Sequence, residues 1–289
     1  MIANIKNNNF QQTIKSPISF CGIGLHSGIH SNVKILPSKE NSGINFVRSD
    51  LNDNNVIKAL WSNVSSTNLS TTISNNHASI STIEHLMSAL SGMHIDNVDI
   101  YVDGPEIPIM DGSSKPFVDL IRNSDFVKQK STRKILKVLK EIEVKKDDSY
   151  AKLIPNNEFS VDFEIEFESH LINKQSCQLQ LINGNYISDI SSARTFGFEK
   201  EVNQLRANGL ALGGSLDNAV VVGENHILNS GGLRYKDEFV RHKILDSIGD
   251  LYLAGYPVQG FFYGKKSGHF LNNQLLKKLL SNNKNFEII

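Results

Sequence analysis

Apolar and polar residues alternate in four short segments of this chain. The pattern is clearest from Val161 to Phe167, where every second residue is apolar and the three residues between are acidic. Shorter stretches of the same kind run from Val33 to Leu36, from Ile44 to Val47 and from Val98 to Val102. Because side chains of a strand point alternately to its two faces, this period predicts half-buried strands in antiparallel or mixed sheets.

Two other segments have the period of a helix. Apolar residues recur every three or four positions from Ile83 to Leu90 and again from Val240 to Tyr252. This spacing gathers them on one face and predicts an amphipathic helix in each segment. We expect the second helix to end near Gly255, because glycine is favoured at helix C-termini.

The polar stretch from Arg122 to Lys134 has no convincing period and divides the chain into nearly equal halves. We interpret it as a linker between domains 1–126 and 133–289. Each half shows strands, a helix and a strand, which predicts an α+β fold of two similar two-layer sandwich domains packed helix layer to helix layer. The three glycines of Gly209 to Ser215 predict a turn in a small insertion. A phosphate-binding loop is the alternative, but the Gly-Lys-Ser/Thr ending is missing.

Composition narrows the class of protein. The 289 residues include 30 Lys plus Arg and 30 Asp plus Glu, so no basic excess favours nucleic acid as a partner. Neither a signal peptide in Met1 to Gln12 nor a membrane-spanning run is recognisable, and we expect a soluble, cytoplasmic protein. Cys21 and Cys177 are too few for a disulfide framework and are expected to be reduced.

Polar residues interrupt both predicted helices and indicate a chemistry. His242 and Asp246 are four residues apart, so on a helix they share a face and could bind one ion. Glu84 and His85 lie on the other helix. If the helices pack together, two histidines, an aspartate and an adjacent glutamate can form a hydrolytic zinc site with three ligands and a base.

Simpler interpretations remain open for these residues. Ser81 and Glu84 fit a capping box, in which both side chains satisfy backbone N–H groups of the first helical turn. His242 and Asp246 fit a solvent-facing ion pair contributing only about 0.3 to 0.5 kcal/mol.

Two further positions carry candidate chemistry. His269 follows a glycine-flanked basic segment and could be an ordinary loop histidine; paired with Asp250 it could instead be held as imidazolium, the form that a general acid requires. Thr195 lies among aromatic residues, as a turn residue or as a donor to an oxyanion.

Seven blocks of the sequence carry a family resemblance. They are Gly22 to Gly28, Ser81 to Leu86, Pro105 to Ser113, Ala193 to Phe198, Leu212 to Ser215, Asp237 to Asp250 and Lys266 to His269. In this order they resemble the UDP-3-O-acyl-N-acetylglucosamine deacetylases, zinc amidohydrolases that commit bacteria with an outer membrane to lipid A synthesis. The resemblance covers nearly the whole chain.

The resemblance implies the catalytic residues. Zinc would be bound by His85, His242 and Asp246, and Glu84 would be the general base for the attacking water. Thr195 would help to hold the oxyanion, and His269, oriented by Asp250, would protonate the leaving amine. Two histidines and a carboxylate also suit Fe²⁺, which is the alternative metal.

The resemblance also implies substrate contacts. Lys243 and Lys266 would meet the sugar or pyrophosphate, and Phe167 and Phe198 the uridine side, with Phe196 as a further substrate contact. A βαβ insertion at about 197–223 would form an apolar passage for the acyl chain. Its candidate lining residues are Leu205, Leu210, Leu216 and Val220.

We therefore expect a monomeric enzyme that hydrolyses the N-acetyl group of UDP-3-O-(3-hydroxyacyl)-N-acetylglucosamine and releases acetate. One alternative is a zinc amidohydrolase for another N-acyl sugar. Another is a non-catalytic module that binds a nucleotide sugar or an acyl chain.

Overall fold

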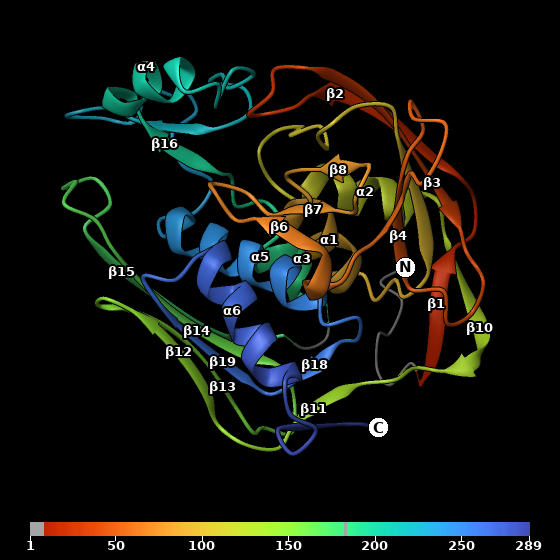
Figure 1. Ribbon diagram of the computed structural model, residues 1–289. Coiled ribbons are helices and arrows are strands. Elements are labelled where there is room, and N and C mark those ends of the chain that lie inside the picture. Colours follow the sequence, from red (N-terminus) through yellow and green to blue (C-terminus); the bar gives the residue numbers. More distant parts are fainter. Residues whose placement is uncertain (1–8, 182–183) are drawn as a thin grey trace.

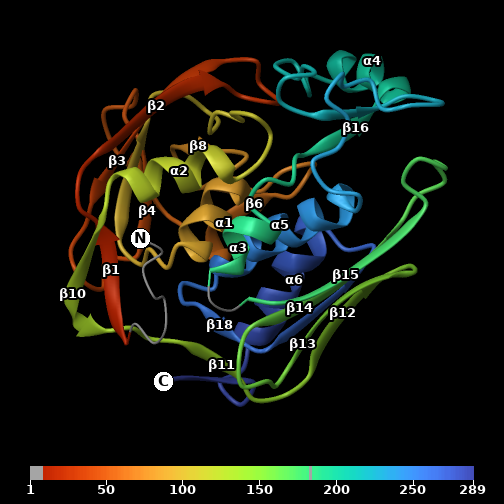
Figure 2. The ribbon, with the colours of Figure 1, turned by 180° about the vertical axis from the view of Figure 1, so that it is seen from behind.

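The computed structural model describes residues 9–181 and 184–289 and has a mixed α+β fold. Two five-stranded sheets lie on the outside, and both views show helices between them (Figures 1 and 2). The helices are α1 (Glu84–Gly92), α2 (Lys115–Asn123), α3 (Asn185–Asp189), α4 (Glu199–Ala207), α5 (Glu238–Tyr252) and α6 (His269–Leu280). None of the helices in the described residues is both long and apolar enough to cross a membrane.

The two large sheets share one strand order. The first runs β2 (Ile18–Ile23), β3 (His30–Pro37), β9 (Val98–Val102), β4 (Ile44–Arg48), β5 (Val56–Lys58). The second runs β12 (Ile142–Lys146), β13 (Ser149–Ile154), β19 (Phe261–Lys265), β14 (Ser160–Glu166), β15 (Lys174–Gln180). In each sheet the last strand lies in the centre, parallel to one neighbour and antiparallel to the other. A parallel neighbour needs a crossover connection, and α1 and α5 lie in these two connections.

Smaller sheets complete the fold. They are β1 (Phe10–Ile14) with β10 (Phe126–Thr132); β6 (Val64–Ser66), β7 (Thr72–Ser74) and β8 (Ser79–Ile80), after a 3₁₀ turn at Trp61–Asn63; β11 (Leu136–Val138) with β18 (Val258–Gln259) and β20 (Phe286–Ile288); and the parallel pair β16 (Phe196–Phe198) and β17 (Val220–Val222). Because α4 connects β16 to β17, the segment expected as a βαβ insertion has this arrangement.

The periodic segments form the predicted elements: all four alternating stretches are strands, and the helical ones become α1 and α5. The segment expected as a linker is structured instead: Arg122 lies in the last turn of α2, which ends at Asn123, and residues 126–132 form β10, paired with β1. Polar side chains of β10 make hydrogen bonds to other parts of the chain. Gln129, for example, accepts a hydrogen bond from the Asn97 amide. The segment from Val258 to Lys265 is divided at Gly260 between two sheets, with β18 beside β11 and β19 in the second large sheet.

Helices α1 and α5 pack against each other at a close crossing. Their apolar faces are fully buried, including Leu86 and Leu90 on α1 and Ile244 on α5. Each such side chain contributes about 1.5 to 3 kcal/mol by burial. At the crossing Gly249 meets the first turn of α1, and a Cβ there would lie 2.0 Å from the Glu84 carbonyl oxygen. Glycine at this position therefore lets α1 and α5 approach closely enough for the polar residues Glu84 and His85 to reach His242 and Asp246.

Candidate metal centre and active site

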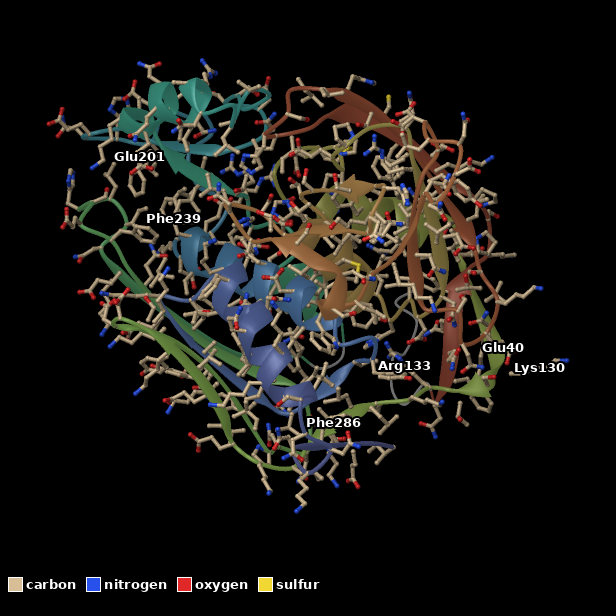
Figure 3. The ribbon with its side chains drawn as sticks, viewed as in Figure 1. Glu40, Lys130, Arg133, Glu201, Phe239 and Phe286 are labelled. Carbon is tan, nitrogen blue, oxygen red and sulfur yellow. The ribbon has the colours of Figure 1, made fainter. Side chains whose placement is uncertain are left out.

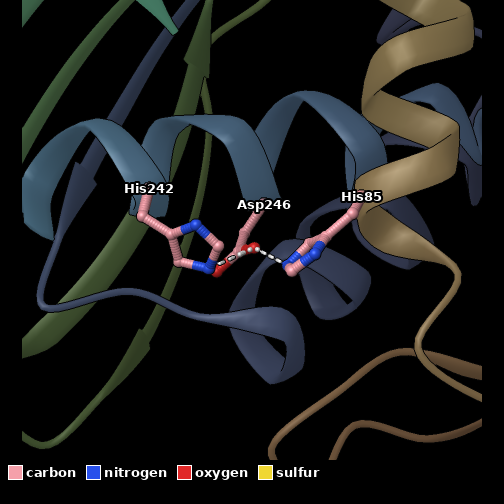
Figure 4. Close-up of side chains that lie close together, drawn as sticks. All are labelled: His85, His242 and Asp246. Carbon is pink, nitrogen blue, oxygen red and sulfur yellow. Dashed lines mark ion pairs between the residues drawn. The ribbon is translucent and has the colours of Figure 1, made fainter. Parts of the chain in front are cut away.

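His85, His242 and Asp246 meet between α1 and α5 (Figure 4). Asp246 Oδ1 lies 3.5 Å from His85 Nε2 and 3.3 Å from His242 Nε2. The two imidazole rings are edge to face, with centroids 4.9 Å apart. One candidate ligand atom from each residue lies within 4.8 Å of the others, which is the span of a single metal ion's ligands.

The buried oxygen of this group fits a cation. The three residues are only 4%, 2% and 2% exposed, yet Asp246 Oδ1 has no hydrogen-bond partner among the residues that the structure describes. Burying a carboxylate oxygen without a partner costs free energy. A cation bound by this oxygen and by the two imidazole nitrogens that face it would remove that cost. His242 Nδ1 contacts the Ala193 carbonyl oxygen at 3.1 Å, so its other nitrogen is left to face the site.

The protonation states also suit metal binding. Burial lowers the pKa of His242 to about 3, which makes its imidazole neutral at pH 7, as a metal ligand must be. Burial raises the pKa of Asp246, but nearby positive charge, including that of Lys243, outweighs it and holds that pKa well below its usual range. Lys243 Nζ lies 2.9 Å from Asp246 Oδ2, so the second carboxylate oxygen is already satisfied.

Glu84 is buried beside this group and does not cap its helix. The side chain at the N-terminus of α1 makes no capping hydrogen bond, and Ser81 Oγ donates to the Pro105 carbonyl oxygen instead. The capping-box interpretation is therefore wrong. Glu84 Oε2 accepts the Thr71 N–H at 3.0 Å, and burial raises the pKa of this carboxyl.

His269 is the first residue of α6, so the loop-histidine interpretation is also wrong. Its Nδ1 lies 2.9 Å from Asp250 Oδ2, and its Nε2 lies 3.8 Å from Glu84 Oε1. Burial lowers the pKa of His269, but Asp250 and Glu84 outweigh it and raise that pKa to about 9. At pH 7 the ring is an imidazolium that can donate a proton. The predicted pairing with Asp250 is confirmed.

Other side chains hold this pair. Asp250 also accepts hydrogen bonds from Asn272 Nδ2 at 2.8 Å and Thr71 Oγ1 at 2.6 Å. Thr71 thus contacts Glu84 through its backbone and Asp250 through its hydroxyl. The sequence analysis did not find Thr71 or Asn272; the polar run around Thr71 was the only signal.

Thr195 faces the same site from the segment directly before β16. Its N–H donates to the Gly112 carbonyl oxygen at 2.8 Å, and its side chain lies on the cavity wall. The preceding residue is held by Glu238, which is fully buried and accepts the Arg194 N–H at 3.0 Å and the Arg194 Nε–H at 2.8 Å. This anchor fixes the start of the Thr195 segment.

A cavity of 680 Å³ opens over these residues and extends beneath the insertion. All the predicted substrate contacts line it: Lys243, Lys266, Phe167, Phe196, Phe198 and Leu216. Phe167 packs edge to face against Phe196 and at a tilt against Phe198, with ring centroids 5.7 Å apart in each pair. Lys266 pairs with Asp148 at 2.8 Å and Glu166 at 2.7 Å. Figure 3 shows Glu201 of α4, another residue of the wall, and Phe239, which packs on Phe196, on this side of the molecule.

The candidate acyl-passage residues are only partly as expected. Leu205 and Leu216 are on the cavity wall, whereas Leu210 is not. Val220 is fully buried, and its neighbour Val221 faces the cavity instead. Successive residues of a strand point to opposite faces, so an error of one position in β17 moves the side chain off the wall.

Comparisons with known proteins agree with this site. The family model for LpxC, UDP-3-O-acyl N-acetylglycosamine deacetylase, matches residues 11–281. A UDP-3-O-acyl-N-acetylglucosamine deacetylase of Psychrobacter cryohalolentis is 47% identical over 281 residues, covering 96% of this chain and 88% of the relative. Those of Syntrophus aciditrophicus (48%, covering 96% and 88%) and Thioalkalivibrio sulfidiphilus (44%, covering 96% and 92%) are similar.

The family model covers most of the chain, and the first two relatives are 47% and 48% identical to it over 96% of its length. Sequence identity this high over nearly the whole chain indicates common family membership. The matched range, residues 11–281, includes Glu84, His85, His242, Lys243 and Asp246, which form the group described above. The chain therefore belongs to the UDP-3-O-acyl-N-acetylglucosamine deacetylase family of metal-dependent enzymes.

Proposed function

We propose that this chain hydrolyses the N-acetyl group of UDP-3-O-(3-hydroxyacyl)-N-acetylglucosamine, with acetate and the free glucosamine amine as products. The reaction is the committed step of lipid A biosynthesis. The observation that carries the proposal is the unpaired, buried Asp246 Oδ1 between two histidine nitrogens, next to a buried glutamate and a charged histidine.

The metal in this proposal is zinc, held by His85, His242 and Asp246, with Fe²⁺ as the alternative. When bound, the ion supplies a Lewis acid for the amide carbonyl and lowers the pKa of the attacking water toward about 7. Asp246 has its second oxygen paired with Lys243, so one oxygen remains for the ion.

Glu84 takes the proton of the attacking water. Its burial raises the pKa of its carboxyl above the ordinary value, which makes the carboxylate a stronger base. The Thr71 N–H orients Glu84 through Oε2, so Oε1 is left to face the water.

His269 protonates the leaving amine at Nε2. Asp250 binds the opposite nitrogen, Nδ1, and holds the ring in its charged form. Thr195 stabilises the oxyanion from across the cavity. One carboxyl and one imidazolium, 3.8 Å apart, thus divide the base and acid roles.

The cavity supports the substrate assignment. Its aromatic cluster offers flat surfaces to a uracil ring, and Lys243 and Lys266 offer positive charge to the sugar or pyrophosphate. Beneath the insertion the wall is apolar at Leu205 and Leu216, as an acyl chain requires.

The same proposal includes two domains, 1–126 and 133–289, each built on one five-stranded sheet and packed through their helices. The identical strand orders of the two sheets support it, as does the crossing of α1 and α5. A site between the domains would then take residues from both.

Acetate release tests the function. Metal-free protein, protein loaded with Zn²⁺ and protein loaded with Fe²⁺ are each given the acylated substrate and, separately, UDP-N-acetylglucosamine. We expect metal-dependent release with the acylated substrate and far less with the bare nucleotide sugar. No release under any loading overturns the proposal. Equal rates with both substrates would favour the amidohydrolase for another N-acyl sugar.

A further inference from the structure

Glu106 is a buried carboxylate outside the catalytic group. It is 0% exposed and lies in the segment between β9 and α2. Its Oε1 accepts the His26 N–H at 2.9 Å and the Thr82 hydroxyl at 2.7 Å, and its Oε2 accepts the Ser27 N–H at 2.7 Å. Glu106 therefore binds the backbone N–H groups of the loop that contains His26 and Ser27.

That loop, residues 24–28, joins β2 to β3 and forms part of the substrate cavity. Leu25 and His26 are on the cavity wall. Gly24 lies directly against the carboxylate, since a Cβ there would be 2.4 Å from Glu106 Oε2. The loop and Glu106 thus fit together with no room for a side chain at this position.

The opposite side of the loop binds the insertion. The Leu212 N–H donates to the His26 carbonyl oxygen at 3.2 Å, and the Gly213 N–H donates to the Leu25 carbonyl oxygen at 3.0 Å. A Cβ on Gly213 would lie 2.2 Å from the Gly24 carbonyl oxygen. Ala211 and Gly214 also face the cavity. Loops 24–28 and 211–214 therefore form one shared wall, made from both halves of the chain.

We propose that Glu106 is a positioning residue that fixes this shared wall and thereby sets the selectivity for the length of the acyl chain. The inference rests on the proposed function, because it assigns a determinant of substrate choice to the same cavity. Glu106 itself does not line the cavity, so it acts through the loop.

The Glu106→Gln substitution isolates this role. It keeps the size of the side chain but exchanges one acceptor oxygen for an NH₂ donor. In one orientation the NH₂ faces the Ser27 N–H, and in the other it faces the His26 N–H. Either way one backbone hydrogen bond of the loop is replaced by two opposed donors.

The assay compares kcat/KM for substrates with a long and a short 3-O-acyl chain. We expect Glu106→Gln to reduce the long-chain to short-chain ratio about tenfold, since a displaced cavity wall would lose apolar contact that a longer chain makes to a greater extent. Gly213→Ala separates the loops from the other side and should reduce the ratio similarly. The double variant should lose less than the product of the two effects, because both act on the same contact.

Asp96→Asn is the matched control. Asp96 is a mostly buried carboxylate that accepts the Gln12 N–H at 2.8 Å and the Arg133 Nε–H at 2.7 Å. Figure 3 shows Arg133 on the side of the molecule opposite to Glu201 and Phe239. This variant should lose comparable stability and keep the ratio of the wild type.

Backbone hydrogen exchange of residues 22–29 provides a readout without substrate. Exchange should be faster in Glu106→Gln than in the wild type and unchanged in Asp96→Asn. Unchanged exchange overturns the positioning role even if the wild type has no activity. If the wild type is active, an equal loss for both chain lengths, or a ratio reduced equally by the control, overturns the assignment of selectivity.

Discussion

The Asp250→Asn substitution tests the electrostatics of the acid with little change in geometry. Asp250 Oδ2 accepts from His269 and Asn272, and its Oδ1 accepts from the Thr71 hydroxyl. An asparagine can keep its oxygen toward His269 and Asn272 and turn its NH₂ toward Thr71, whose hydroxyl can also accept. The substitution thus removes a charge and retains the contacts.

The magnitude follows from the pKa of His269. Its rise from 6.5 to about 9 is equivalent to roughly 3 kcal/mol of stabilisation of the charged ring, at about 1.4 kcal/mol per pKa unit. Because the folded pKa is above the unfolded one, this stability is fully present below pH 6.5 and is lost as the pH rises through about 9. Among the groups that raise the pKa of His269, the Asp250 carboxylate makes the largest contribution.

Two measurements check this prediction. Denaturant unfolding of metal-free protein should show the variant less stable than the wild type below pH 6.5, with the gap narrowing as the pH approaches 9. In the pH profile of kcat/KM the basic limb, which reports loss of the acid's proton, should move at least about one unit lower. Both proteins must carry the same metal, since a bound cation also lowers the pKa of His269.

An unmoved basic limb in a folded, metal-loaded Asp250→Asn protein would show that another group is the acid. A stability gap that does not vary with pH would refute the charge argument and leave only a lost contact. His269→Gln is the companion variant, and it should remove the limb altogether.

Three further predictions concern the metal, the base and the passage. Asp246→Ala should lose metal and activity together; one tightly bound metal per chain with near-normal turnover would contradict the ligand set. Glu84→Gln should retain metal and stability while kcat falls about 10² to 10⁴-fold, measured beside metal content, and full activity would exclude the base role. Leu216 is 50% exposed, so Leu216→Glu should change unfolding free energy by no more than about 0.5 kcal/mol yet depress the acylated substrate far more than UDP-N-acetylglucosamine. Equal depression of both substrates would argue against an acyl passage there.

The sequence predicted those elements whose burial follows a period. β9 alternates buried and half-buried residues, and the apolar residues of α5 recur every three or four positions, so the hydrophobic pattern alone was sufficient. β10 was missed because its pattern is mostly polar and its pairing with β1 depends on contacts more than a hundred residues away in the chain. Such pairing is decided by tertiary structure and leaves no local signal.

The site shows the same division. The spacing of His242 and Asp246 predicted a shared face, which any helix would provide. Glu106 could not be found in this way, because its hydrogen-bond donors are far from it in the sequence. Thr82 is 24 residues away, and His26 and Ser27 are about 80 residues away. Only the fold joins Glu106 to Thr82, a β-branched residue with a left-handed φ of 55°, two residues before the first residue of α1. Strain of this kind persists where the surrounding contacts determine the backbone.

The contact between α1 and α5 is therefore not built for stability alone. Its interior holds Glu84, His85, His242, Asp246 and Asp250, and each charged group among them must be removed from water at a cost. An apolar interface of similar shape would satisfy the same two helices without that cost, as the fully buried leucines and isoleucines around it show. The polar groups are instead satisfied in pairs by Lys243, Thr71 and Asn272, and the oxygen left over faces the two histidines. A core that departs from the apolar rule at one place, and leaves Asp246 Oδ1 unpaired there among the described residues, is what the proposed cation site requires.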